Sequence, residues 1–241
     1  MFKHTIFIPQ INYAYFCEIF ISTMAYKAVI AGATGLIGSS LLNILLNQQE
    51  YTEVLILVRR ATGIQHKKLT ELVIDFDKLD DCADKITGHA VFCCLGSTQK
   101  KTPDIKDYHK IDHDYPLHLA HLAVKNGVEQ YHLVSSLGAD NKASNFYLKT
   151  KGEVENDLKK AGVKCLQIYR PAYLTGDRKE YRFADKLLTL LMAIINPLLF
   201  GSLKKYRSIP AQTVAMAMFK ESIKNDEGIF IHPSDQIKQI A

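Results

Sequence analysis

The sequence lacks the cysteine patterns of disulfide-rich and zinc-stabilised proteins. Its five cysteines are an odd number and include no CxxC pair, which argues against both a disulfide framework and a structural zinc site. The lysines are scattered, so the net charge of +5 does not predict a nucleic-acid partner. No repeat or low-complexity linker divides the 241 residues. We expect one globular domain in a reducing compartment, the cytoplasm, with no nucleic acid as partner.

Long uninterrupted apolar runs are also missing. The most apolar segment, residues 187–200, is shorter than the roughly twenty residues needed to cross a bilayer, and Asn196 and Pro197 interrupt it. We favour a segment that covers a substrate pocket, with burial between the subunits of an oligomer as a related explanation. Peripheral contact with a membrane through the flanking basic residues is the alternative. On the favoured interpretation, residues 177–210 cover the site and the substrate is apolar.

Residues 1–23 show no clear periodicity. They mix aromatic side chains with Pro9, Gln10 and Glu18 ahead of the first predicted strand. Glu18 interrupts the apolar core that a secretory signal peptide needs. We therefore expect a loosely attached N-terminal extension, followed by a domain that covers residues 24–241.

A glycine-rich turn follows the first predicted strand. Residues 28–31 form an apolar run typical of a buried parallel strand, and leucine and isoleucine recur at helical spacing from residue 36. Between them, Gly32 permits a tight turn, Gly35 lets a pyrophosphate approach the backbone, and Gly38 lets the helix pack closely on the sheet. Free amides at the helix N-terminus then form an anion site, the physical basis of dinucleotide binding. The cofactor contacts expected here are Gly32, Thr34, Gly35, Leu36, Ile37 and Gly38.

Two arginines follow the second predicted strand, residues 53–58. Arg59 and Arg60 stand where a dinucleotide-binding fold has the side chain that reads the adenosine ribose. An acidic residue there would accept hydrogen bonds from the 2′-hydroxyl, whereas two guanidinium groups suit a 2′-phosphate. The sequence therefore predicts NADP(H) as the cofactor and disfavours NAD(H).

The remaining strands and helices alternate. Further strands are predicted at residues 71–75, 89–95, 131–134 and 164–169, with a short helical segment at 79–86. Such alternation is typical of a single doubly wound parallel sheet with helices on both faces, the Rossmann fold. Asp75, which closes the third strand, is expected to approach the adenine, and Gly96, which closes the fourth, is expected to begin a loop beside the cofactor. A helix at 211–224 and a strand at 228–232 are expected to complete the domain.

The segment 108–121 carries four histidines at helical spacings, His109, His113, His118 and His121. We nevertheless expect no metal site, because Pro116 breaks or starts the helix there and no glutamate follows in HExxH form. The neighbouring Asp112 and Asp114 suit a solvated face. The segment is instead predicted to be an outer helix that faces the sheet with Leu119, Leu122 and Ala123.

A tyrosine and a lysine stand one helical turn apart after the fifth predicted strand. Tyr147 and Lys151 share a helix face, and Ser135 and Ser136 end the preceding strand. Carbonyl reduction needs a proton donor as well as a hydride donor, and a phenol with an ordinary pKa of about 10 is too weak an acid unless positive charge stabilises its phenolate. We expect Lys151 to supply that charge and to reach the nicotinamide ribose, while Ser136 holds the substrate oxygen. The predicted catalytic residues are Ser136, Tyr147 and Lys151, the last two also counted as cofactor contacts.

The motifs GATGLIG, LVRR, VSS, YLKTK and YRPAYLTG occur in an order that resembles the atypical short-chain dehydrogenase/reductase family. The resemblance runs from about Tyr26 to the C-terminus. The segments CCLGSTQKK, VSSLGAD and SNFYLKTKGEVE are similar to the Tat-interacting oxidoreductase-like branch of that family. The resemblance implies a Rossmann fold, NADP(H), and catalytic positions at Ser136 or Ser135, Tyr147 and Lys151. It also implies that Arg170 and Pro171 open a loop over the nicotinamide.

Two hypotheses about function follow. The first is an NADP(H)-dependent oxidoreductase that transfers a hydride to or from a carbonyl or alcohol substrate of apolar character. The second is a non-catalytic NADP(H)-binding protein that recruits a protein or a membrane through its apolar segment. The presence of serine, tyrosine and lysine together favours the enzyme.

Overall fold

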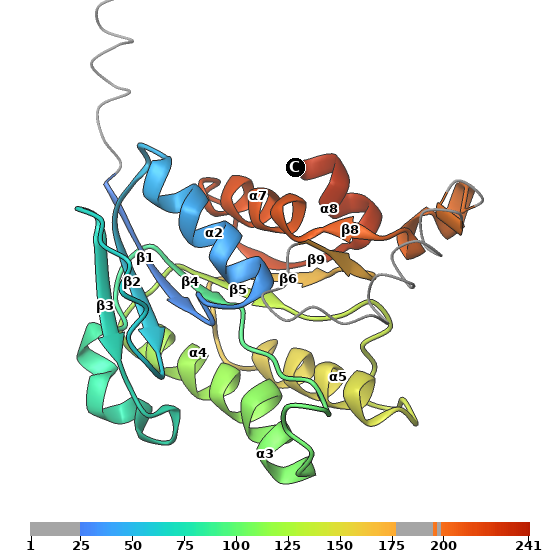
Figure 1. Cartoon of the computed structure of the whole chain (residues 1–241), viewed down its shortest axis with the longest axis horizontal. Helices are drawn as coiled ribbons and strands as arrows, with labels where there is room; N and C mark the ends of the chain where they lie inside the picture. The colour runs from blue at the N-terminus through green and yellow to red at the C-terminus, as the bar shows by residue number, and fades with distance from the viewer. Residues whose placement is uncertain (1–24, 177–194, 197–198) are drawn as a thin grey trace, which may run out of the picture.

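The computed structural model describes residues 25–176, 195–196 and 199–241. Its main feature is a seven-stranded sheet of order β3-β2-β1-β4-β5-β6-β9, in which every neighbouring pair is parallel (Figure 1). The order reverses between β1 and β4, so the predicted single, doubly wound Rossmann sheet is confirmed. The strands are β1 (Tyr26–Ala31), β2 (Tyr51–Val58), β3 (Leu69–Val73), β4 (Ala90–Cys93), β5 (Gln130–Val134), β6 (Cys165–Arg170) and β9 (Gly228–Pro233).

Helices cover both faces of this sheet (Figure 1). One face carries α2 (Leu36–Asn47), α7 (Ala211–Ser222) and α8 (Ser234–Ile240). The other carries the 3₁₀ segment η1 (Phe76–Lys85), α3 (Ile105–His109), the π-helical turn η2 (Lys110–Asp114), α4 (Tyr115–Lys125) and α5 (Phe146–Leu158). Successive side chains of a strand point to opposite faces of the sheet. Ala28 and Ile30 therefore belong to the hydrophobic core under α2 and α7, whereas Val29 and Ala31 belong to the core under α4 and α5. The predicted outer helix is confirmed as α4, whose inner face buries Leu119, Leu122 and Ala123.

Two predicted strand ends that bear on the site differ from the structure, and one helix was not predicted. The third strand ends at Val73, because β3 pairs with β2 only from Leu69 to Val73. Asp75 therefore does not close a strand, and instead caps η1 by accepting a hydrogen bond from the Asp77 amide at 3.0 Å. The fourth strand ends at Cys93, so Gly96 lies within the following loop rather than at the strand end. The final helix α8 was not predicted, since its seven residues carry little periodic signal.

The predicted N-terminal extension, residues 1–23, lies outside the described residues, as do residues 177–194 of the predicted covering segment. The described part of that segment contains η4 (Gly201–Tyr206) and β8 (Ile209–Pro210), which pairs with β7 (Leu174–Thr175). Within the described ranges, no helix combines the length and the apolar character needed to cross a bilayer.

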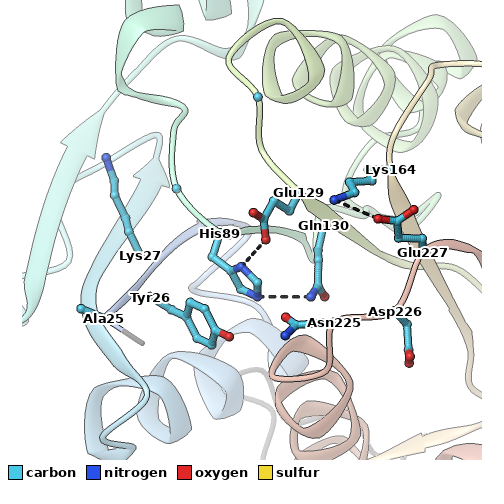
Figure 2. Close-up of a pocket in the computed structure, with 12 residues that line it drawn as sticks. Ala25, Tyr26, Lys27, His89, Glu129, Gln130, Lys164, Asn225, Asp226 and Glu227 are labelled. Carbon is cyan, nitrogen blue, oxygen red and sulfur yellow. Dashed lines mark hydrogen bonds and ion pairs between the residues drawn. The ribbon is translucent and has the colours of Figure 1, made fainter. Parts of the chain in front are cut away.

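A pocket of about 600 Å³ opens at the amino edge of the sheet. Figure 2 shows His89 in this pocket, with its imidazole 2.9 Å from the Glu129 carboxylate and 3.2 Å from the amide nitrogen of Gln130. The lining residues Ala25, His89, Glu129 and Lys164 each stand directly before a strand. Parallel α/β sheets bind nucleotides at the opposite, carboxyl edge. This pocket is therefore not the candidate nucleotide site.

A buried histidine behind this pocket is held in its neutral form. His132 on β5 is completely buried, with Nδ1 at 3.1 Å from the Tyr169 hydroxyl and Nε2 at 3.0 Å from Oε1 of Gln130. The Gln130 amide group donates to the Lys224 carbonyl, so its Oε1 must accept from His132 Nε2–H. Burial, reinforced by the charges of His89 and His232, lowers the pKa of His132 to about 3.

This neutral histidine should make the domain sensitive to mild acid. The unfolded chain takes up a proton at His132 below about pH 6.5, whereas the fold does not until about pH 3. The free energy of unfolding should therefore fall as the pH falls across that window, by roughly 2 kcal/mol from this group between pH 6.5 and pH 4.5. Urea unfolding of wild type and His132→Gln at both pH values measures the effect, because the variant should lose less stability on acidification. Equal losses in the two proteins would contradict it.

Candidate functional site

The turn between β1 and α2 requires glycine at two positions. Gly32 has φ of +86°, and a Cβ there would lie 2.5 Å from the carbonyl oxygen of Cys94. A Cβ on Gly38 would lie 2.2 Å from the Gly32 carbonyl oxygen. Both distances are far inside van der Waals contact, so α2 and the end of β4 can approach the turn only because these residues lack side chains. The predicted roles of these two glycines in the tight turn and in helix packing agree with this geometry.

The N-terminus of α2 has no side-chain cap among the described residues. Its N-cap is Gly35, which has no side chain, and its first turn contains no acidic residue. The amides of the first turn have no acceptor within the helix, which suits a phosphate. Thr34 and Gly35 are exposed and Leu36 is half-buried, whereas the side chain of Ile37 packs into the core. Ile37 can therefore offer a ligand only its backbone amide.

Arg59 and Arg60 lie at the same edge of the sheet as the glycine turn. β2 runs beside β1 with Leu57 opposite Ala31, so the residues that follow both strands are neighbours. Both arginines are exposed, and neither forms an ion pair with any residue of the described ranges. Two uncompensated positive charges thus stand where the ribose end of a dinucleotide is expected. Asp75 follows β3 at this edge and is exposed, but one oxygen of its carboxylate is engaged in capping η1.

The central polar contact of the site is a buried ion pair. Lys151 of α5 is 4% exposed and Asp112 of η2 is fully buried, and Lys151 Nζ lies 2.9 Å from Asp112 Oδ1. The backbone amide of Ser97 donates to Asp112 Oδ2 at 2.8 Å, and Lys151 Nζ donates to the Val134 carbonyl at 3.4 Å. The pair therefore ties together α5, η2, the end of β5 and the loop after β4. A charged pair inside the protein is costly unless other contacts compensate it, and the Ser97 amide and the Val134 carbonyl supply two such contacts here.

Electrostatics keep Lys151 charged. Burial alone would lower its pKa, but the charge of Asp112, the ionised form of Tyr147 and the hydrogen bond that Lys151 donates to Asp112 outweigh burial and raise the pKa of Lys151. Gly96 lies directly against this pair, since a Cβ there would be 3.5 Å from Asp112 Oδ1 and 3.8 Å from Lys151 Nζ. The predicted cofactor loop and the predicted catalytic lysine thus meet in the structure.

The prediction that Asp112 lies on a solvated face was wrong. Tyr108, Asp112 and Pro116 are spaced four residues apart and are all buried, so they form one inward stripe that continues through η2 into α4. An acidic residue on a stripe of buried residues needs a partner, and in the structure that partner is Lys151. Asp114, by contrast, is exposed as predicted.

The two serines after β5 have different surroundings. Ser135 is buried and its hydroxyl donates to Glu155 Oε1 at 2.5 Å. Ser136 is half-buried, and the acceptor of its hydroxyl is the Leu137 carbonyl at 3.4 Å, a long contact. Gly152 brings α5 against the loop that these serines begin, because a Cβ there would lie 2.2 Å from the backbone amide of Asn141. Of the two hydroxyls, that of Ser136 belongs to the more exposed side chain and forms the longer hydrogen bond.

Glu155 is a second buried carboxylate that the sequence did not reveal. It is 1% exposed, accepts from Ser135, and forms an ion pair with the guanidinium of Arg170, whose Nε lies 2.9 Å from Oε1. Arg170 ends β6, and the following Pro171 is buried, with its carbonyl accepting from the Leu137 amide at 3.0 Å. Arg170 therefore joins β6 to α5. Most of the chain beyond Pro171 that was expected over the nicotinamide lies outside the described residues.

A pocket of about 620 Å³ opens beside Tyr147. The Tyr147 side chain is 39% exposed, and Phe146 packs edge-on against Tyr108 with ring centroids 5.6 Å apart. The hydroxyl of Thr98 is buried here without a hydrogen-bond partner in the described part of the chain. The pocket is lined by Ser97, Thr98, Gln99, Thr102, Pro103, Ile105, Tyr108, Ser144, Asn145, Phe146 and Tyr147. Its walls thus come from the loop after β4 and from the start of α5.

Comparisons with known proteins agree with this arrangement. A family model described as NAD(P)H-binding matches residues 32–194. Protein HTATIP2 of Rattus norvegicus is 34% identical over 214 residues, which cover 85% of each chain. Protein fmp52, mitochondrial, of Aspergillus fumigatus is 32% identical over 213 residues, covering 85% of this chain and 90% of the relative.

Solved structures show the same fold at low sequence identity. The Bordetella bronchiseptica enzyme WbmH in complex with NAD+ superposes with a TM-score of 0.67 at 17% sequence identity. The match covers 87% of this chain and 76% of the WbmH chain. MoeE5 in complex with UDP-glucose and NAD superposes with a TM-score of 0.65 at 18% sequence identity. The match covers 85% of this chain and 74% of the MoeE5 chain. The family match and the 34% identity also confirm the resemblance to atypical short-chain dehydrogenase/reductases and their Tat-interacting oxidoreductase-like branch. The chain therefore belongs to the NAD(P)H-binding family and is a Rossmann-fold protein whose cofactor is NAD(P)(H).

Proposed function

We propose that the protein is an NADP(H)-dependent oxidoreductase that transfers a hydride to or from a carbonyl or alcohol carbon. The observation that carries this proposal is Lys151, held buried and charged by Asp112 next to Gly96 and one helical turn from the exposed Tyr147. Nucleotide binding alone would account for the ammonium group but not for the solvent-accessible phenol one turn away. Perturbed, buried charges next to a pocket are typical of catalytic sites.

The glycine turn suits a dinucleotide. Gly32 and Gly38 leave room that a Cβ would fill, the N-terminus of α2 has no cap from a side chain, and Arg59 and Arg60 stand at the ribose end. These residues would hold the phosphates and the adenosine ribose, with Lys151 at the nicotinamide ribose. When bound, the nicotinamide ring supplies or accepts the hydride.

Tyr147 is the group proposed to move the proton. In the reduction direction its hydroxyl proton goes to the carbonyl oxygen while the hydride forms the new C–H bond, so the product is an alcohol and the tyrosine is left as a phenolate. The positive charge of Lys151 stabilises this phenolate, and bulk solvent returns the proton. The Ser136 hydroxyl donates to the substrate oxygen. The oxidation direction uses the same groups in reverse.

The pocket beside Tyr147 favours an apolar substrate. Ile105, Pro103 and Phe146 contribute hydrocarbon to its walls, and each Å² of hydrocarbon removed from water stabilises the complex by roughly 25 cal/mol. The unpartnered Thr98 hydroxyl offers one hydrogen bond to a polar group of the substrate. We therefore propose aldehydes and ketones with an aliphatic or aromatic body as the substrate class.

The proposal is tested by following NADPH absorbance with purified protein and a panel of apolar aldehydes and ketones. We expect turnover of at least one compound, with polar analogues of equal size reacting more slowly. If every compound fails while NADPH binds tightly, the non-catalytic alternative is correct: a nucleotide-binding protein that recruits a partner or a membrane surface. We place the protein in the cytoplasm, and imaging of tagged protein tests this, since relatives such as that of Aspergillus fumigatus are named mitochondrial.

Cofactor preference should depend on the two exposed arginines. Replacing both Arg59 and Arg60 with alanine removes the charge-assisted hydrogen bonds expected at the 2′-phosphate, each worth roughly 1.5–3 kcal/mol. NADPH should then bind at least tenfold more weakly, a loss of about 1.4 kcal/mol or more, while NADH binding should stay nearly constant. Titration calorimetry with both nucleotides measures this. The double variant Lys67→Ala, Lys68→Ala, which also removes two charges near β3, serves as the control, and equal loss in both proteins would refute the assignment.

A further inference from the structure

We propose that His109, His113 and Asp114 form a binding site for a divalent transition metal, with Zn²⁺ as the expected ion. One nitrogen of each imidazole and one oxygen of the carboxylate lie within 4.8 Å of one another. Asp114 Oδ1 is 3.2 Å from His109 Nδ1 and 2.8 Å from His113 Nδ1. Ligands of a tetrahedral zinc ion with bonds of about 2.0–2.1 Å are separated by roughly 3.3 Å, so the donors need to move little.

The second nitrogen of each imidazole also faces a carboxylate. His109 Nε2 is 3.5 Å from Glu153 Oε2, and His113 Nε2 is 3.2 Å from Asp157 Oδ2. Both acidic residues belong to α5 and stand one turn apart. A carboxylate on the far nitrogen of a ligating histidine orients the ring and increases its basicity, and this arrangement accompanies most histidine–metal sites. Asp157 thus already forms the hydrogen bond of an outer-shell partner, and Glu153 approaches the same position on His109.

A bound metal ion explains the contacts between the two imidazoles and the carboxylates better than the histidines do without one. A neutral imidazole has one N–H, so each ring would point a nitrogen lone pair at a carboxylate oxygen. The other solution is two imidazolium cations, whose rings are tilted by 33° with centroids only 4.4 Å apart. Lys149 and Lys160 pair with Glu153 and Asp157 at 3.9 Å and 3.0 Å, which leaves the Asp114 carboxylate as the uncompensated charge. A metal ion between the Nδ1 atoms and Asp114 removes the conflict.

The sequence argued against a metal because of Pro116 and the missing HExxH glutamate, whereas the facing carboxylates Glu153 and Asp157 come from α5, far along the chain. The π-helical turn η2 connects His109 to His113 and also carries Asp112, the partner of Lys151. A bound ion would therefore stiffen the turn that holds the proposed catalytic lysine. His109 is 35% and Asp114 52% exposed, so an ion can enter from solvent and water can complete its coordination. The site does not depend on the proposed reaction.

The test uses tag-free full-length protein, treated with a chelator and then titrated with Co²⁺ by visible absorption and with Zn²⁺ by calorimetry. Wild type should bind one equivalent and gain thermal stability. His113→Ala and His109→Asn should bind at least 100-fold more weakly, and Asp157→Asn roughly tenfold more weakly. His118→Ala should bind as wild type does, because His118 pairs with Asp80 at 3.2 Å outside the cluster.

Circular dichroism and urea midpoints establish that each variant is folded. The exposed position of His109 makes His109→Asn informative even if His113→Ala unfolds. Absence of saturable binding at one equivalent in wild type would overturn the proposal. Unchanged affinity in His109→Asn would also overturn it, because the ion would then be held elsewhere in the chain.

Discussion

Tyr147→Phe should lower turnover by roughly 10²–10⁴-fold, the range contributed by a positioned general acid. The substitution removes one oxygen from a side chain that is 39% exposed, so folding and the shape of the pocket should not change. NADPH affinity should stay within about twofold, because the phenol hydroxyl acts on the substrate oxygen rather than on the nucleotide. Steady-state kinetics on a substrate from the carbonyl panel, together with NADPH titration, measures both quantities.

The matched control for this variant is Tyr115→Phe. Tyr115 donates its hydroxyl to Asp77 at 2.7 Å on the outer surface, away from the pocket. The Tyr115→Phe variant should keep a turnover close to that of the wild-type protein. If Tyr147→Phe retains full turnover, Tyr147 is not the acid, and the proton must come from another group or from water.

Asp112→Asn should destabilise the protein by about 3 kcal/mol or more, since removing one partner of a buried ion pair leaves the other charge uncompensated. Asparagine keeps an oxygen that can accept from the Ser97 amide, so the cost reports the loss of charge beside Lys151. Turnover should fall with it, because Lys151 would lose either its charge or its position. Urea unfolding gives the stability, and kinetics gives the activity.

A double-mutant cycle separates the ion pair from general damage to the core. Lys151→Met should also destabilise the protein, but Asp112→Asn combined with Lys151→Met should cost less than the sum of the single variants, because no unpaired charge remains. The double variant should be folded and inactive. Additive costs would mean that the two side chains do not depend on each other, and Asp112 would then have no role in positioning Lys151.

The fold was predictable because its signals are local. The apolar run of β1, the glycines at 32, 35 and 38 and the repeated strand and helix periods are each contained within short segments. Parallel pairing then follows from the alternation of strand and helix. Element boundaries were less accurate where the pattern is weak, as at β3, an edge strand without a fully buried residue. There the partner strand β2, rather than the sequence itself, determines where pairing stops.

The site was predictable only in part, because its buried charges are paired across long sequence distances. Tyr147 and Lys151 can be recognised as a pair on one predicted helix. The burial of Asp112 and of Glu155 could not be predicted, because each is paired with a residue of another element, Asp112 with Lys151 and Glu155 with Arg170. The π-helical turn η2 also has no recognisable sequence pattern. Ser135 and Ser136 illustrate the same point, since the choice between adjacent hydroxyls depends on the position of Glu155.

Hydride transfer itself is tested most directly with NADPH that carries deuterium at the transferable position of the nicotinamide. After incubation with a reducible apolar aldehyde or ketone, mass spectrometry of the product shows whether the deuterium has moved. We expect one deuterium on the former carbonyl carbon with wild-type protein, and at least about 100-fold less labelled product in the same time with Tyr147→Phe, although both proteins bind NADPH. Wild-type protein that binds NADPH but transfers no deuterium to any compound of the panel would refute hydride transfer as the function.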